Sequence, residues 1–501
     1  EALDRRREDR RNGNDDDDGG GGGGFVAGRV TGRGQRTIVR PGDLTLPVAS
    51  LALRGAEVHS KLDEWSERGV IEPDAAAAVR NLRAEEDLDL TTSEWAFVVM
   101  GAGAAMGPLG TLLELGATVI GLDLPIPGVW ERLMGVAERS PGTLLFPLRP
   151  EEGGNGNINS NSNEGGDGSN KIIDRTDANA FSLAARAGCN LLTEIPELID
   201  WLVEQCPSKR LVLGSYAYLD SAAFVRVSLA MDAVASETLR DRPDSALAYL
   251  CSPTDVFAVP PGARDAAALR AADRSQKTRF QRLVSALAPR GRIMDPNIVA
   301  PTRNGSPLPL VDALVLQQGP NYFLAKRLQH WRVMLEAHRN GTVVSSNVAP
   351  ASNTRSVLKN KLLAAAYAAA HHIGPIEIFE PDTSNVLMTY LLLNDLKCGL
   401  AREEGEGRRR SRDGGGGGDL PGAPISTSRY LTLVGGRTDL ADHPLNIFAT
   451  TPVHNGIWRC GYQIRSLLEL VLAYYVGDRV RTPALAAAAA GAGAAWLRSR
   501  M

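Results

Sequence analysis

The stretch "WAFVVMGAGAAMGPLGTLLELGATVIGLDLP", residues 95–125, contains the pattern that decides the fold. An apolar run of strand length ends at Met100, and three glycines follow it closely: Gly101, Gly103 and Gly107. A helical segment then leads to Gly116, and a second apolar run ends in Asp123. The order strand, glycine loop, helix, strand and acid is typical of a dinucleotide-binding unit.

The residue types in this loop have a physical reason. Glycine allows the backbone to turn sharply and to approach a pyrophosphate closely, and the following helix offers free N–H groups to the negative charge. Asp123 lies 22 positions after Gly101, which suits a hydrogen bond to a ribose 2′-hydroxyl. Because its charge would repel a 2′-phosphate, NAD(H) is favoured and NADP(H) is the second candidate. A loop used only for packing, with Asp123 as a strand-end cap, is the alternative.

The same alternation of strands and helices extends along the chain. Further apolar runs of strand length lie at 143–148, 210–216, 245–252 and 342–349. Helical stretches separate most of them, at 108–115, 129–138, 192–205, 221–240 and 320–339. Strands that are apolar throughout and alternate with helices predict an α/β fold, a doubly wound parallel sheet that is Rossmann-like.

Composition divides the chain into a core region and extensions. We expect a flexible tail at 1–45, a helical extension at 46–92, a Rossmann domain at 93–398, a disordered loop at 399–425 and a C-terminal extension at 426–501. The Rossmann domain has loops inserted near 151–175 and 260–310. The aromatic-rich segment 443–476 could form a substrate lid or a dimer surface, so a homo-oligomer is a candidate assembly.

Charge and cysteine usage limit the partners. A net charge of −3 and a pI near 6.3 do not predict a nucleic-acid partner. The scattered cysteines read as reduced thiols of a cytoplasmic or stromal protein: Cys189, Cys206, Cys251, Cys398 and Cys460. No apolar run reaches the roughly 18 residues of a membrane span. The chain begins at Glu1 rather than Met, so the question of a targeting peptide ahead of it stays open.

The order of motifs resembles the short-chain dehydrogenase/reductases. Their Gly-x-x-x-Gly-x-Gly loop aligns with residues 101–107, where Ala105, followed by Met106, replaces the middle glycine. The remaining landmarks follow in the family's order as "AAFVRVSLAMDAVASETL", "SALAYLCS", "NYFLAK" and "GTVVSSNVAPASNTRSV". In the last of these, Pro350 and Thr354 match the cofactor loop after the sixth strand. The resemblance covers roughly residues 93 to 390 and implies an NAD(P)-dependent oxidoreductase.

A tyrosine and a lysine are the family's acid–base pair, and here they are Tyr322 and Lys326. Four residues apart on a helix, the two side chains share one face. A phenol with a pKa near 10 is a weak acid–base group at neutral pH, and we expect the ammonium to lower that pKa. The resemblance also implies that Lys326 holds the nicotinamide ribose. Ordinary packing of the two side chains is the alternative.

Other positions depart from the family's pattern. The family's serine lies about a dozen residues before the tyrosine, where this chain has "SPLPLVDALVLQQGP"; Ser252, at the end of a strand, is the substitute candidate. Ser228 stands where an asparagine is expected, and "GSYAYLD" replaces the Asn-Asn-Ala-Gly segment. We expect no metal site, because the adjacent His371 and His372 would diverge by about 100° on an α-helix.

Three functions follow as hypotheses. In the first, the chain interconverts a carbonyl and an alcohol of a small-molecule substrate by hydride transfer, with Tyr322 as acid or base. In the second, it is a non-catalytic Rossmann protein that binds a dinucleotide in a regulatory or scaffolding role. In the third, it is a sugar-nucleotide enzyme of the extended branch of the family, which also uses the Tyr/Lys pair.

Overall fold

The computed structural model describes most of the chain and leaves several segments out. Its described residues are 24–35, 44–83, 86–150, 172–176, 179–273, 277–282, 294–299, 309–412 and 444–479. Among these, no helix combines the length and the apolar character that crossing a bilayer requires. No disulfide joins any two of the five cysteines, all of which lie within these described ranges.

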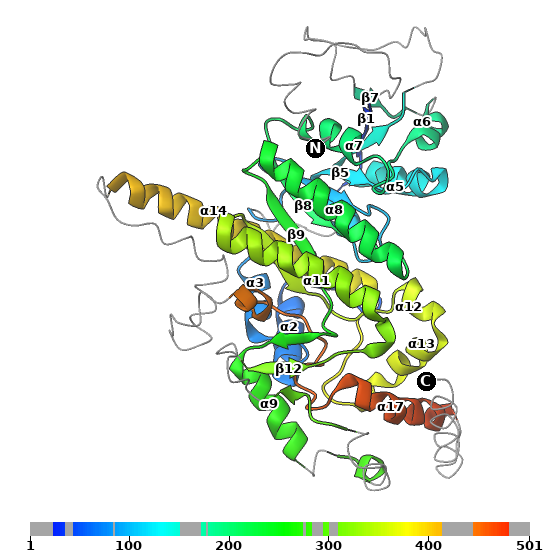
Figure 1. Ribbon diagram of the computed structural model, residues 1–501, viewed down its shortest axis with the longest axis vertical. Coiled ribbons are helices and arrows are strands. Elements are labelled where there is room, and N and C mark those ends of the chain that lie inside the picture. Colours follow the sequence, from blue (N-terminus) through cyan, green and yellow to red (C-terminus); the bar gives the residue numbers. More distant parts are fainter. Residues whose placement is uncertain are drawn as a thin grey trace.

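An eight-stranded sheet forms the centre of the molecule (Figure 1), in the order β13-β9-β8-β4-β5-β6-β1-β7. Six of its strands are mutually parallel: β4 (Trp95–Met100), β5 (Thr118–Leu122), β6 (Thr143–Leu148), β8 (Arg210–Ser215), β9 (Ala246–Cys251) and β13 (Val344–Val348). Numbered along the chain, these six have the spatial order 3-2-1-4-5-6, which is that of the Rossmann fold. The predicted α/β class is confirmed at this level.

The apolar strands have both faces buried. In β4, Phe97 and Val99 belong to the hydrophobic core on one face of the sheet, whereas Val98 and Met100 belong to the core on the other. Side chains alternate between faces along a strand, so only a strand covered by helices on both sides is apolar throughout. The continuous run "WAFVVM" is explained by this arrangement.

Helices cover the two faces of the sheet. On one side α4 (Leu109–Glu114), α5 (Pro127–Arg139) and α14 (Pro381–Arg412) pack together or against the strands. On the other side lie α7 (Ile195–Val203), α8 (Ala222–Asp241) and α11 (Pro320–Leu335), with α8 and α11 side by side in Figure 1. A π-helical turn, η2 (Glu336–Asn340), follows α11.

The N-terminal region differs from the prediction. Within the predicted tail, β1 (Val26–Thr31) joins the main sheet antiparallel to β6, and β7 (Ile172–Asp174) pairs with it. The tail prediction is therefore wrong for β1, which brings apolar side chains into the core. The predicted helical extension contains α2 (Ala56–Arg68) and α3 (Pro73–Arg80), but a hairpin of β2 (Thr45–Val48) and β3 (Leu51–Arg54) precedes them.

The inserted region after β9 forms a small unit of its own. It contains α9 (Pro261–Ala272), η1 (Leu316–Gln318) and a three-stranded sheet of β10 (Val256–Ala258), β12 (Leu310–Asp312) and β11 (Ile298–Val299). The predicted loop at 260–310 is thus partly ordered secondary structure. Of the inserted segment near 151–175, residues 151–171 lie outside the described part of the chain.

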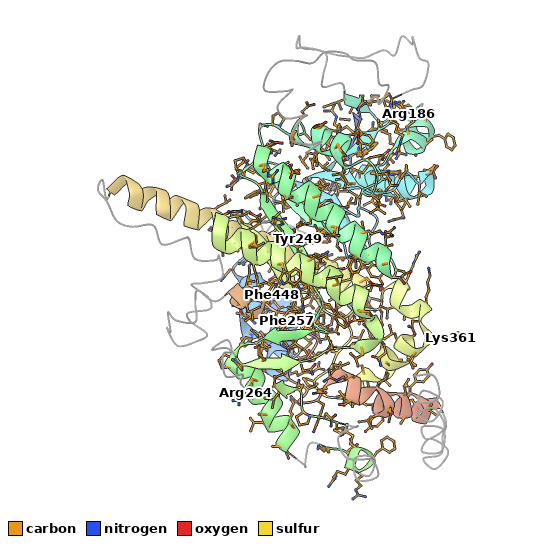
Figure 2. The ribbon with its side chains drawn as sticks, viewed as in Figure 1. Arg186, Tyr249, Phe257, Arg264, Lys361 and Phe448 are labelled. Atoms are coloured by element: carbon orange, nitrogen blue, oxygen red, sulfur yellow. The ribbon has the colours of Figure 1, made fainter. Side chains whose placement is uncertain are left out.

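The C-terminal region packs on this unit. After β13 come α12 (Arg355–Lys359), α13 (Lys361–Ala369), η3 (Ala370–His372), η4 (Pro444–Ala449) and α17 (Ile464–Arg479). Phe448 and Trp458 are buried, and Phe448 lies next to Phe257 of β10, with ring centroids 6.0 Å apart (Figure 2). Both of these aromatic side chains belong to the core. Helix α14 continues to Arg412, where the sequence predicted a loop from residue 399; residues 413–425 lie outside the described part.

Candidate functional site

The glycine loop makes a sharp turn at the end of β4. Gly101 has a φ of 91°, and a Cβ at this position would lie 2.5 Å from the backbone of Ala217. Gly103 donates its N–H to Oδ2 of Asp123 at 2.6 Å. A side chain at Gly101 would be both strained and in collision. Asp123 therefore holds the loop in place, as the strand-cap alternative requires. Because each carboxylate oxygen has two lone pairs, Asp123 can also accept a hydrogen bond from a ligand.

A cavity of about 240 Å³ opens beside this loop. Its lining includes Gly101, Gly103 and Asp123, together with Tyr218 from the segment after β8. From β4 the chain proceeds to β5 on one side, whereas from β8 it proceeds to β9 on the other. The cavity therefore lies where the strand order reverses, which is where open α/β sheets bind their ligands.

Arg132 on α5 reaches the same cavity next to Asp123. A Cβ placed on Gly103 would be 3.1 Å from both the Arg132 Nη2 and the Asp123 Oδ2, so the two charged groups flank one spot. An acid at this place favours a free ribose 2′-hydroxyl, and a guanidinium accommodates a 2′-phosphate. Arg132 was not predicted from the sequence, although its position on the helix after the Asp123 strand is a signal that could have identified it.

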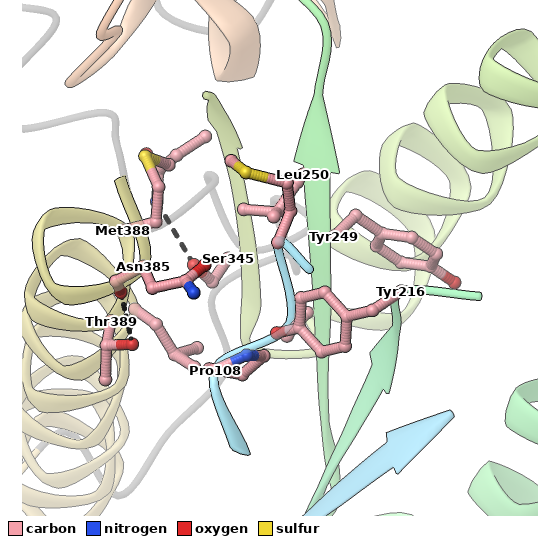
Figure 3. Close-up of a pocket in the computed structure, with 12 residues that line it drawn as sticks. Pro108, Tyr216, Tyr249, Leu250, Ser345, Asn385, Met388 and Thr389 are labelled. Carbon is pink, nitrogen blue, oxygen red and sulfur yellow. Dashed lines mark hydrogen bonds between the residues drawn. The ribbon is translucent and has the colours of Figure 1, made fainter. Parts of the chain in front are cut away.

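Ala105, Met106 and Pro108 lie on the α14 side of the loop. The carbonyl of Ala105 accepts a hydrogen bond from Asn385 Nδ2 at 3.0 Å. Met106 and Pro108 line a second cavity, of about 10 Å³, between the loop, the strands and α14 (Figure 3). That volume is near the limit for one water molecule. Ala105 and Met106, expected at the cofactor, thus lie on the α14 side of the loop.

Tyr322, near the start of α11, is packed among aromatic rings. Its ring centroid is 5.6 Å from that of Phe224 on α8 and 6.4 Å from that of Tyr218. Burial raises the pKa of the Tyr322 phenol, and a hydrogen bond with the Ser252 hydroxyl opposes this rise. The prediction that the pKa is lowered is wrong for this structure, because desolvation outweighs the favourable contacts. A phenol of this kind holds its proton at neutral pH and can act as a donor.

Lys326 is fixed one turn further along α11. Its Nζ donates to the carbonyl of Leu250 at 2.9 Å and to Oε1 of Gln329 at 3.3 Å. It also lies 5.8 Å from the centroid of the Phe224 ring. Burial lowers the pKa of the Lys326 ammonium. The lysine therefore ties α11 to β9, which is the packing role that the sequence left open for it.

Ser252 begins a chain of hydrogen bonds at the end of β9. Its Oγ lies 2.6 Å from Oγ1 of Thr254, and that hydroxyl donates to Oε1 of Gln318 at 2.8 Å. With the Ser252–Tyr322 contact, the order is Tyr322, Ser252, Thr254, Gln318. Thr254 and Gln318 were missed, since nothing in their local sequence marks them. Ser228, at the expected asparagine position, is buried on α8 and makes no hydrogen bond through its hydroxyl in the described structure.

The loop after β13 is held by the C-terminal segment. Asn455, with a φ of 57°, bonds through its side chain to the N–H of Ala351, to the carbonyl of Ala351 at 3.2 Å and to the carbonyl of Glu377 at 2.6 Å. Thr354 caps α12, accepting from Val357 N at 3.5 Å. Pro350 and Thr354 lie outside the lining of the larger cavity. Asn455 was missed too, although the Asn-Gly pair at 455–456 is a turn signal.

The structure thus brings the predicted residues into two neighbouring groups. Gly101, Gly103 and Asp123 share the cavity, and Ser252, Tyr322 and Lys326 gather where β9 meets α11. Tyr218 connects the groups, because it lines the cavity and touches Tyr322. The fold and site define a Rossmann-like α/β protein with a cavity at its switch point. No family model and no curated protein matches the chain.

Proposed function

We propose that the chain is an NAD(P)-dependent oxidoreductase, with NAD(H) preferred, that interconverts a carbonyl and an alcohol. The observation that supports this most is the continuity between the two groups of residues. A cavity of about 240 Å³ is slightly smaller than the ~300–1,000 Å³ of ordinary ligand sites, so it suits one nucleoside portion of a dinucleotide. Tyr218 lines that cavity and its ring contacts Tyr322, whose phenol lies next to the Ser252 hydroxyl.

Each side chain has a role in this proposal. Asp123 accepts from the adenosine ribose while bracing Gly103. The Tyr322 phenol donates its proton to the carbonyl oxygen of the substrate, and the hydroxyl of Ser252 holds the same oxygen. Lys326 keeps α11 in register with β9. The nicotinamide, when bound, supplies the hydride.

Two measurements on the full chain test the proposal. The first is titration with NADH, followed by displacement with adenosine 5′-monophosphate; displacement is expected because the cavity at Asp123 suits the adenosine half. The second is a crystal structure with NADH, in which the nicotinamide should lie within hydride reach of a pocket that contains Tyr322. NADH binding that adenosine 5′-monophosphate does not weaken, or a nicotinamide remote from Tyr322, would contradict the proposal.

A non-catalytic dinucleotide-binding role is the second candidate. The supporting observation is that the polar groups of the site are engaged within the chain: Lys326 with the Leu250 carbonyl and Ser252 with Thr254. This candidate predicts firm NADH binding without oxidation of the cofactor by aldehydes or ketones. It also predicts that Tyr322→Phe leaves every binding constant unchanged.

A further inference from the structure

Two histidines and one aspartate meet far from the cavity, where the turn after α13 packs against α17. Nε2 of His372 lies 3.2 and 3.1 Å from the two carboxylate oxygens of Asp478. His371 is the third member, and one ligand atom from each residue lies within 4.8 Å of the others. Within the described parts of the chain, this is the one group of three or more metal-ligating side chains at such separations.

This geometry corrects the reasoning from sequence. Adjacent positions diverge by about 100° on an α-helix and by about 120° in a 3₁₀ turn such as η3, which holds both histidines, so it is the side-chain torsions of His371 and His372 that bring the rings together. Their ring centroids are 4.2 Å apart, so both rings point to the same side. The third ligand comes from another helix, 106 residues further along the chain, and no local pattern marks it.

The tautomer of His371 suits metal binding. Its Nδ1 lies 3.0 Å from the carbonyl of Ala368, an acceptor, so the proton belongs on Nδ1. The lone pair of Nε2 is then available to an ion. A histidine that donates its other ring N–H to a backbone carbonyl is the usual arrangement around protein-bound metals, because it fixes the ring and raises its basicity.

The other two ligands are held in place by packing. The ring of His372 stacks on Tyr474 at 4.3 Å between centroids, with an interplanar angle of 13°. Tyr474 is in turn hydrogen-bonded through its hydroxyl to Thr278 at 2.7 Å and packs on Phe280. Asp478 follows Tyr474 by one turn of α17, so the two share a face. The packing of Tyr474 therefore holds both His372 and Asp478 in position.

We propose that His371, His372 and Asp478 bind one divalent transition-metal ion, of the Zn²⁺ class. Zn²⁺ accepts both imidazole nitrogens and a carboxylate oxygen, whereas Mg²⁺ and Ca²⁺ prefer oxygen ligands and are disfavoured by the two imidazoles. Two ligands at ~2.0–2.1 Å from a tetrahedral ion are roughly 3.3 Å apart. The His372–Asp478 separation is already close to that. The ion lies between His372 Nε2 and the carboxylate, and the proton on Nε2 moves to Nδ1, so the imidazole stays neutral. A rotation of the His371 ring completes the set and leaves a fourth position for water.

The consequence is a metal-dependent attachment of the last described helix. The ion would join η3 to α17, whose other contacts to this region are mainly the packing of α17 on α13. Binding to the folded chain alone raises the free energy of unfolding by mass action.

Titration of the full chain with Zn²⁺ tests the proposal, with calorimetry and thermal unfolding as readouts. One equivalent should bind, and His371→Ala or Asp478→Asn should weaken it at least ~10-fold and remove the increase in melting temperature. His371→Ala is the informative variant, because it leaves the His372–Asp478 contact intact. His59→Ala, which removes a histidine on α2, is the matched control and should change neither quantity.

X-ray absorption at the zinc edge separates this site from binding by cysteines. Nitrogen and oxygen ligands give a first shell at ~2.0–2.1 Å, whereas thiolates lie near 2.3 Å. A shell at the shorter distance supports the proposal. A thiolate shell, or an affinity that is the same in the wild type, His371→Ala and Asp478→Asn, overturns it and leaves an adventitious ion only.

Discussion

The two ends of the candidate site are built in different ways. The glycine-loop half, at β4 and β5, takes its main residues from one continuous stretch, since Gly101, Gly103 and Asp123 all fall within residues 95–125. The tyrosine half, at β9 and β13, draws Ser252, Tyr322 and Asn455 from distant parts of the chain. The glycine-loop half can be recognised from its own spacing, whereas Ser252 and Tyr322 were expected only from the family resemblance and Asn455 was missed.

The two halves also depend on different supports. The glycine loop is braced by Asp123, which closes the next strand along the chain. The loop after β13 is braced by Asn455, and next to it His454 and Arg459 both contact the buried Glu72 of the N-terminal extension. Changes in the extensions should therefore affect the tyrosine half first.

Replacing the tyrosine should have the largest effect. Tyr322→Phe keeps the ring contacts with Phe224 and Tyr218 but deletes the proton. If the tyrosine half is catalytic, single-turnover hydride transfer with a reactive carbonyl should fall by roughly 10²–10⁴, with NADH affinity unchanged.

The matched control is Tyr462→Phe, which loses only a hydrogen bond to the carbonyl of Arg270. It should leave both quantities near the wild type. Undiminished turnover in Tyr322→Phe would end the catalytic assignment and leave the glycine-loop half as a binding site.

The next largest effect concerns stability. Glu72 is buried and accepts from Arg459 at 2.6 Å and from His454 Nε2 at 2.9 Å. Burial acts against its charge, but these partners prevail and lower the pKa of Glu72 to about 2. Glu72→Gln breaks the buried ion pair, so the free energy of unfolding at pH 7 should fall by about 3–5 kcal/mol. Denaturant unfolding measures it.

The pH dependence of the wild type follows from the same shift. A folded pKa below the unfolded value stabilises the protein above the unfolded pKa, near 4.5. That contribution is lost as the pH falls from about 4.5 to about 2, and Glu72→Gln should lack the loss. Glu64→Gln, at an exposed pair with Lys61, is the control and should cost no more than about 1 kcal/mol. Hydrogen exchange should show the β13 loop losing protection before β4 and β5; equal loss would contradict the division into halves.

Cofactor choice tests the glycine-loop half by itself. In Asp123→Ser the hydroxyl can still accept from Gly103, but the charge that repels a 2′-phosphate is gone and Arg132 remains. The ratio of NADPH to NADH affinity should rise about tenfold, or about 1.4 kcal/mol. Arg132→Ala should shift the ratio the other way. Equal ratios in both variants and the wild type would remove the ribose role.

These contrasts show which strands and site residues can be predicted from the sequence. All six parallel strands were predicted, because a strand buried on both faces appears in the sequence as a short run of apolar residues. Gly101 and Asp123 were found because their spacing is set by one strand–helix–strand unit. Strand β1 was missed because its run "VAGRVT" is short, contains a glycine and follows a polar stretch. Thr254, Gln318 and Asn455 act through contacts across 64 or more residues, which local patterns do not encode.

The smallest expected effect concerns the hydroxyl chain behind Tyr322. Thr254→Val keeps the shape of the side chain but removes the hydroxyl that links Ser252 to Gln318. A lost hydrogen bond of about 0.5–1.5 kcal/mol corresponds to roughly a 2–10-fold slower hydride transfer, if Thr254 positions Ser252. Thr254→Ser restores the hydroxyl and should recover most of the rate, and NADH affinity should stay constant in both variants. Recovery with serine distinguishes positioning from general loss of packing, because serine packs less well than valine. A rate that follows side-chain size instead of the hydroxyl would show that the chain Tyr322, Ser252, Thr254, Gln318 is structural only.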